Sequence, residues 1–178
     1  MKKSTPIALC GTLAALSIVT MFLTALLPLL SMALCAIAGM FLTVIVIEFG
    51  YRYAMMSYVA VALLSGFFVV DKESVVLFCL FFGLYPILKG LIEKLKKRPL
   101  EWVVKIVFFN AAALGYYFLA TAVLGIPVES FTILGEALPV ALLAVGNVFI
   151  VVYDIAFTRL ITTYLFRLQP GLHKRLGL

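Results

Sequence analysis

The stretch that decides the fold runs from residue 4 to residue 47 and reads STPIALCGTLAALSIVTMFLTALLPLLSMALCAIAGMFLTVIVI. It holds 44 consecutive residues without a single charged side chain. At a rise of about 1.5 Å per residue, a helix of that length reaches roughly 66 Å, whereas the hydrocarbon core of a bilayer is roughly 30 Å thick. The stretch therefore predicts two membrane spans, and Pro28, followed by Leu-Leu-Ser, marks the turn between them.

The composition of the remaining chain points the same way. Hydrophobic residues make up 65% of the 178 positions and charged residues only 12%, against about 25% charged residues in a typical soluble domain. So little charge cannot cover a surface in water, and lipid must be the solvent for much of the chain. Further charge-free stretches cover residues 53–70, 74–88, 106–128 and 137–153. A cleaved secretory signal has one short apolar core with nothing comparable after it, so we predict no such signal.

These stretches predict an all-α integral membrane protein that forms one domain over residues 1–178. The six expected transmembrane helices cover approximately residues 6–27, 30–47, 53–70, 74–92, 102–124 and 137–158. The predicted architecture is a helical bundle.

The signs of the charges predict the orientation of the six spans. With the N-terminus inside, the inner segments hold all 14 basic residues except Lys72. The inner ones are Lys2, Lys3, Arg52, Lys89, Lys94, Lys96, Lys97, Arg98, Lys105, Arg159, Arg167, Lys174 and Arg175. The outer segments hold the acidic residues Asp71, Glu73, Glu129 and Glu136. Basic residues concentrate in cytoplasmic segments, so we expect both termini in the cytoplasm of a bacterial cell, with the chain in its inner or plasma membrane.

The net charge of +6 does not indicate nucleic-acid binding. A basic nucleic-acid surface needs its lysines and arginines on a folded, water-facing domain, and the chain has room for none. Orientation in the membrane and attraction to anionic lipid headgroups account for the charge. Cys10, Cys35 and Cys79 lie in apolar runs without metal-ligand spacing, and the single histidine, His173, lies in the basic tail. We therefore predict neither a metal site nor a cofactor.

The sequence also argues against an enzyme. Hydrolysis within a membrane needs a serine–histidine pair, two membrane aspartates or a metal-binding histidine motif, and the spans contain none of these. A glycine-rich phosphate loop followed by lysine is missing as well, so the chain carries no motif for ATP hydrolysis.

Polar residues inside spans are costly and often functional. Asn110, Asn147 and Asp154 are the three candidates. The two asparagines can tie helices together, a contribution of about 0.6 kcal/mol per hydrogen bond in membranes, or contact a ligand. Because Asp154 has no second acid or histidine beside it, we expect it to pair with a basic group at the inner face, such as Arg52, rather than to carry protons.

The first span carries a strip of small residues. Ala8 and Thr12 are four residues apart, as are Gly11 and Ala15, so the two pairs form one smooth helix face. Small side chains let two membrane helices approach closely. The strip predicts either docking of a partner helix or packing within the chain.

With this strip, the chain resembles the substrate-binding S components of energy-coupling factor (ECF) transporters. The likeness consists of the short basic N-terminus running into IAL at residues 7–9 and LAAL at residues 13–16, six spans with both ends inside, and a length below 200 residues. In that family an Ala-x-x-x-Ala strip of the first helix docks on the coupling helices of a membrane partner. Here Ala8, Gly11, Thr12 and Ala15 stand in that place, two of them not alanine. The resemblance thus implies a membrane partner subunit with cytoplasmic ATPases.

The resemblance further implies a membrane-embedded substrate-binding subunit for uptake of a small, vitamin-like solute. In such a fold the solute enters from outside and rests among the outer halves of the later helices. The ligand-binding residues expected there are Tyr85, Tyr116, Tyr117, Glu129 and Asn147. This set suits a flat, weakly charged heterocycle, although the tyrosines could also pack between helices. The alternative function is a non-transporting scaffold or accessory subunit of a membrane complex, for example in cell-envelope machinery.

Overall fold

The computed structural model describes residues 4–93, 98–127 and 139–169, and over these ranges the chain forms helices and no strands. The elements in chain order are α1 (Ser4–Leu26), η1 (Pro28–Leu30), α2 (Ser31–Phe49), α3 (Tyr51–Phe68), α4 (Lys72–Leu77), η2 (Phe78–Phe82), α5 (Tyr85–Ile92), α6 (Arg98–Ala122), α7 (Pro139–Thr163) and η5 (Tyr164–Leu168). The prediction of an all-α protein is confirmed for the described ranges.

Five of the helical segments are long and apolar enough to cross a membrane. They cover Pro6–Leu26, Pro28–Phe49, Lys72–Ile92, Pro99–Ala122 and Gly146–Arg167. Each of the five overlaps one of the predicted spans, although Gly146–Arg167 begins and ends nine residues later than the predicted span 137–158. The sixth predicted span, 53–70, overlaps α3, which is helical but is not one of the five. Several long apolar helices in one chain are typical of a multi-pass membrane protein.

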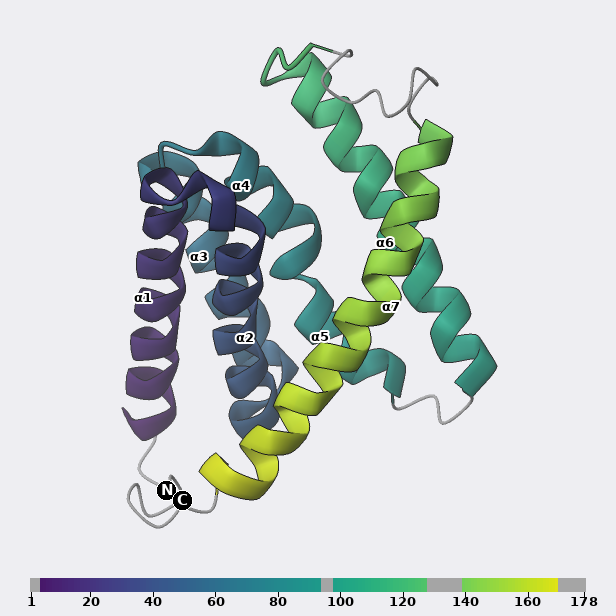
Figure 1. Cartoon of the computed structure of the whole chain (residues 1–178). Coiled ribbons are helices and arrows are strands. Elements are labelled where there is room, and N and C mark those ends of the chain that lie inside the picture. The colour runs from purple at the N-terminus through teal and green to yellow at the C-terminus, as the bar shows by residue number, and fades with distance from the viewer. Residues whose placement is uncertain (1–3, 94–97, 128–138, 170–178) are drawn as a thin grey trace.

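The helices form a bundle with a crossing pair beside it (Figure 1). Helices α1, α2 and α3 contact one another, and α2 also contacts η2 and α5. Helices α6 and α7 contact each other and stand beside this bundle (Figure 1). The start of α1 and the end of η5 lie at the same end of the molecule (Figure 1).

Tight turns join the first helices. Pro28 begins η1, so the predicted turn lies where the sequence placed it. Gly50 alone separates α2 from α3 and has φ +84°, a left-handed conformation that glycine adopts without steric cost. Asp71 caps α4, because its two carboxylate oxygens accept from the Ser74 amide at 3.2 Å and the Ser74 hydroxyl at 2.5 Å. This cap positions the acidic turn that matters below.

A π-helical segment, η2, interrupts the rod made by α4 and α5. In its wider turn, the Gly83 amide donates to the Phe78 carbonyl, five residues earlier, at 2.7 Å. The Tyr58 hydroxyl of α3 donates to the Cys79 carbonyl of the same segment, also at 2.7 Å. Helix α2 packs directly on this segment, since a Cβ added to Gly39 would lie 2.3 Å from the Phe82 carbonyl oxygen. Single π-helical turns inside helices often mark functional sites, and this one begins the aromatic junction described next.

Candidate functional site

An aromatic cluster joins the bundle to the α6–α7 pair. Phe81 of η2 lies at its centre, with ring centroids 5.3 Å from Tyr85, 5.5 Å from Phe109 and 5.6 Å from Tyr153. Tyr85 is fully buried. Aromatic pairs at these separations add packing energy beyond the area they bury. The cluster therefore stabilises the contact between the bundle and the α6–α7 pair.

A cavity of about 1020 Å³ borders this cluster. Its walls come from the end of α1, η1, the start of α2, the turn into α4, η2, α6 and α7. Pockets for small molecules measure roughly 300–1,000 Å³ and are mostly apolar with a few placed polar groups. The cavity meets this description in size and in lining.

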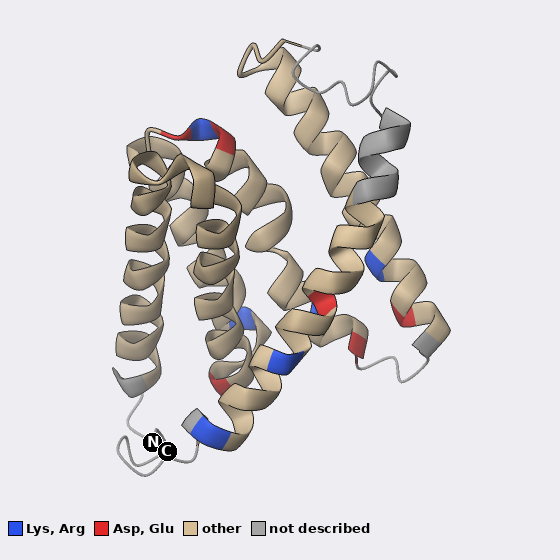
Figure 2. Ribbon diagram, in the orientation of Figure 1, with Lys and Arg blue, Asp and Glu red and all other residues tan. Residues whose placement is uncertain are grey.

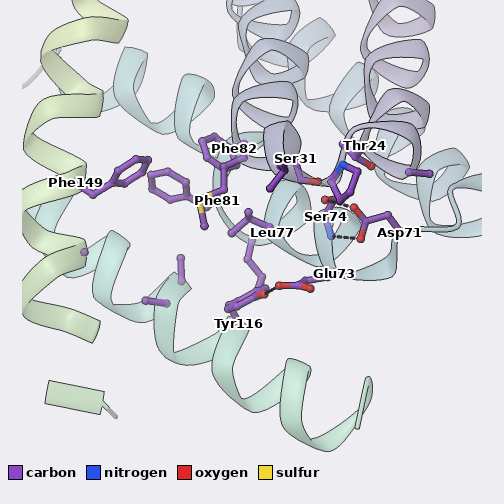
Figure 3. A pocket seen from close by; sticks show the side chains of 18 of the residues that line it. Thr24, Ser31, Asp71, Glu73, Ser74, Leu77, Phe81, Phe82, Tyr116 and Phe149 are labelled. Carbon is purple, nitrogen blue, oxygen red and sulfur yellow. Dashed lines mark hydrogen bonds between the residues drawn. The ribbon is translucent and has the colours of Figure 1, made fainter. Parts of the chain in front are cut away.

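The lining is divided between a polar part and an aromatic part (Figure 3). The polar part contains Thr24, Ser31, Asp71, Glu73, Ser74 and Tyr116, and the aromatic part contains Phe81, Phe82, Phe109 and Phe149. The Tyr116 hydroxyl of α6 donates to Glu73 Oε1 of α4 at 2.5 Å, which joins the bundle to α6 at the polar part (Figure 3). The described lining residues include no lysine, arginine or histidine.

The structure describes four of the five residues predicted to bind a ligand, and of these four only Tyr116 lines the cavity. Tyr116 lines the cavity, whereas Tyr85 lies in the aromatic cluster and Tyr117 packs its ring edge against Phe118 at 5.8 Å. Asn147 exchanges side-chain amide hydrogen bonds of 3.3 Å with Asn110, which ties α6 to α7. The preceding residue, Gly146, lines the cavity, but Asn147 is not itself a lining residue. Glu129 lies outside the described residues.

Sequence reasoning missed most of the lining. The sequence predicts Asp71 and Glu73 only as outer-loop charges, whereas in the structure Asp71 caps α4 and Glu73 lies in its first turn. Phe81 and Phe149 carried no signal, because phenylalanine is equally common on lipid-facing surfaces.

A buried ionic cluster lies on the other side of the aromatic junction. Asp154 of α7 accepts hydrogen bonds from the Tyr85 hydroxyl, from Lys89 Nζ and from Lys105 Nζ, the last at 2.9 Å. Lys89, Lys105 and Asp154 are 1%, 5% and 5% exposed. Lys89 also contacts Glu93 Oε1 at 3.0 Å. One carboxylate therefore ties α5, α6 and α7 together.

This cluster corrects the predicted partner of Asp154. The expectation of a basic partner is confirmed, but Arg52 is not that partner: it is exposed in the first turn of α3. The charges are instead balanced by Lys89 and Lys105. In the sequence, Arg52 precedes one apolar run and Lys89 follows another, and both are predicted at the inner face. Only the packing of α5 against α7 brings Lys89 to Asp154.

The small-residue strip of α1 faces away from the bundle. Ala8, Gly11, Thr12 and Ala15 are all exposed, and a Cβ added to Gly11 would meet nothing within 4 Å. Other positions of α1 pack inward, as the Ser17 hydroxyl does by donating to the Ala38 carbonyl at 2.9 Å. The strip is thus presented on the outside of the described bundle.

The long apolar helices indicate a multi-pass α-helical membrane protein, and the cavity between its bundle and its crossing pair is the candidate ligand site. The chain matches no protein-family model, no curated protein and no solved structure.

Proposed function

We propose that the protein is a membrane-embedded substrate-binding subunit for uptake of a small, vitamin-like solute. The observation that carries this proposal is the cavity of about 1020 Å³, with its aromatic wall and its few polar side chains. Because the sequence has no motif for ATP hydrolysis, the energy for uptake would come from a separate membrane partner with cytoplasmic ATPases. The exposed strip of Ala8, Gly11, Thr12 and Ala15 offers such a partner a smooth helix face.

The charge distribution supports an outward-facing cavity. Among the basic residues of the predicted inner segments, the structure describes the side chains of Arg52, Lys89, Lys105, Arg159 and Arg167. Charged segments gather at the turn between α3 and α4 and in the opposite half of the molecule (Figure 2). By the positive-inside rule, the half with the basic residues faces the cytoplasm. In this six-span topology, both termini lie in the cytoplasm of a bacterial cell. The acidic turn at Asp71 and Glu73, and the cavity beside it, then face outward.

The topology predicts a labelling pattern for single-cysteine variants made in a background without Cys10, Cys35 and Cys79. In intact cells, a membrane-impermeant maleimide should label Ser130→Cys directly. It should label Lys97→Cys and Lys174→Cys only after the membrane is permeabilised, because both positions lie in inner segments. The readout is the fraction of labelled protein on a gel. Labelling of positions 97 and 174 from opposite sides would contradict six spans.

Binding in the cavity predicts that a small molecule stabilises the purified protein. In a thermal-shift panel of vitamins and nucleobases, a ligand at about 100 times its Kd should add roughly 2.7 kcal/mol to the free energy of unfolding. Ala113→Trp should abolish this gain, because Ala113 lines the cavity and a large ring there fills it. Ala111→Trp is the matched control: Ala111 lies on the same helix, is exposed and is not a lining residue.

Two results would count against solute binding: no compound stabilises the protein, or the two tryptophan variants reduce the gain equally. The alternative function, a non-transporting scaffold or accessory subunit, draws on the same exposed strip of α1. Native mass spectrometry of gently purified protein separates the two functions. A retained solute or an ATPase-linked partner supports uptake, whereas a stable complex with an unrelated membrane protein and no solute supports the scaffold.

A further inference from the structure

We propose that the cavity selects a cationic, hydrogen-bond-donating ligand: an amine joined to a flat apolar body. This inference rests on the proposed function, because it names the chemical class of solute that the cavity would take. Three observations carry it: the charge of the lining, the direction of its hydrogen bonds and the separation of its polar and aromatic parts.

The charge of the lining is acidic. Asp71 and Glu73 contribute two carboxylates, and no described lining residue is basic. Lys72 lies between them in sequence but is turned away, since its Nζ donates to the Gly66 carbonyl at 2.7 Å and it does not line the cavity. A bound anion would face two like charges without a counter-ion, whereas an ammonium group would be attracted by both.

The hydrogen bonds make the polar part an array of acceptors. Thr24 donates its hydroxyl proton to the Met21 carbonyl at 2.8 Å, Ser74 donates to Asp71, and Tyr116 donates to Glu73. A hydroxyl has one proton to donate and further lone pairs to accept with. The hydroxyls of Thr24 and Ser74, which both line the cavity, therefore keep lone pairs that can accept. A carboxylate can also accept more bonds than the one per oxygen that Ser74 makes with Asp71. A ligand rich in N–H donors fits this array.

The aromatic part sets the shape of the rest of the ligand. Phe81, Phe82 and Phe149 stand on the side of the cavity away from Asp71 and Ser74 (Figure 3). A flat apolar body placed there leaves water and packs against ring faces. With its amine at the carboxylates and its flat body between the phenylalanines, one ligand can satisfy both parts of the lining.

Three indoles that differ in the end of one side chain test the charge preference: tryptamine, tryptophol and indole-3-propionate. Each is titrated by calorimetry into the full chain in nanodiscs of zwitterionic lipid, so that lipid charge does not bias the result. We expect tryptamine to bind about tenfold more tightly than tryptophol, because its ammonium group can make a charge-assisted hydrogen bond to a carboxylate. Indole-3-propionate should bind most weakly.

Variants assign the preference to the carboxylates. Glu73→Gln keeps the shape and an oxygen that can accept from Tyr116. Asp71→Asn keeps the shape and one of the two oxygens that accept from Ser74. Both variants remove a negative charge, so each should shrink the ratio of tryptamine to tryptophol affinity. Lys72→Gln, which changes the neighbouring charge outside the lining, should preserve the order of the three affinities. Equal binding of the three indoles, or tightest binding of indole-3-propionate, overturns the cationic class while the cavity remains a binding site. If none of the three binds, the cationic class is overturned too, and the vitamin and nucleobase panel decides separately whether the cavity binds solutes.

Discussion

Replacing Asp154 with asparagine should lower the free energy of unfolding by about 3–5 kcal/mol, the usual cost of leaving buried charges without their partner. The carboxylate of Asp154 is the shared acceptor for Lys89, Lys105 and Tyr85, and both lysines are almost fully buried. An amide has no charge to balance two ammonium groups. Unfolding of the purified protein by increasing mole fractions of SDS in a mild detergent measures the change.

The matched control for Asp154→Asn is Glu93→Gln. Glu93 also pairs with Lys89, at 3.0 Å, but its side chain is 46% exposed, and exposed ion pairs contribute at most about 1 kcal/mol. Combining Asp154→Leu with Lys89→Met and Lys105→Met should recover most of the loss, because well-packed apolar groups often replace a buried ionic cluster without cost. A loss for Asp154→Asn no greater than that for Glu93→Gln would mean that the cluster does not hold the three helices together.

Gly39→Ala should lower the free energy of unfolding by about 1–3 kcal/mol, the typical cost of overpacking. The added Cβ would lie 2.3 Å from the Phe82 carbonyl oxygen and 3.1 Å from its carbonyl carbon. Both are backbone atoms, so no side chain can rotate away, and α2 or η2 must move. The SDS titration measures the loss. Since Phe82 lines the cavity, the same variant should also weaken ligand binding in the thermal-shift panel.

Gly66→Ala provides the comparison for Gly39→Ala. Gly66 is also helical, but a Cβ added there meets nothing within 4 Å. Alanine is favoured over glycine in a helix by about 0.5–1 kcal/mol, so this variant should be neutral or more stable. Equal effects of the two substitutions would show that α2 and η2 are not packed backbone to backbone.

The sequence by itself determined where the helices are. The charge-free residues 4–47 became α1, η1 and α2, with the break at Pro28 as predicted. The later predicted spans also coincide with helices, within a few residues at each end. The physical reason is local: a long apolar stretch must satisfy its own backbone hydrogen bonds, and a helix does so within the segment. The α5–η2–α4 rod differs only by its π-helical turn, which depends on contacts with α2 and α3.

Only the tertiary structure decided which side chains meet. Helical periodicity tells which residues share a face of one helix, but not which helix lies opposite that face. Asp154 therefore had Arg52 as a plausible partner until the packing of α5 and α6 against α7 brought Lys89 and Lys105 to it. For the same reason Tyr85, expected at the ligand, lies in the aromatic junction, bound to that carboxylate. The cavity brings the turn at Asp71 beside α6 and α7, which are far from it in sequence, and such a meeting is a property of the packed helices alone.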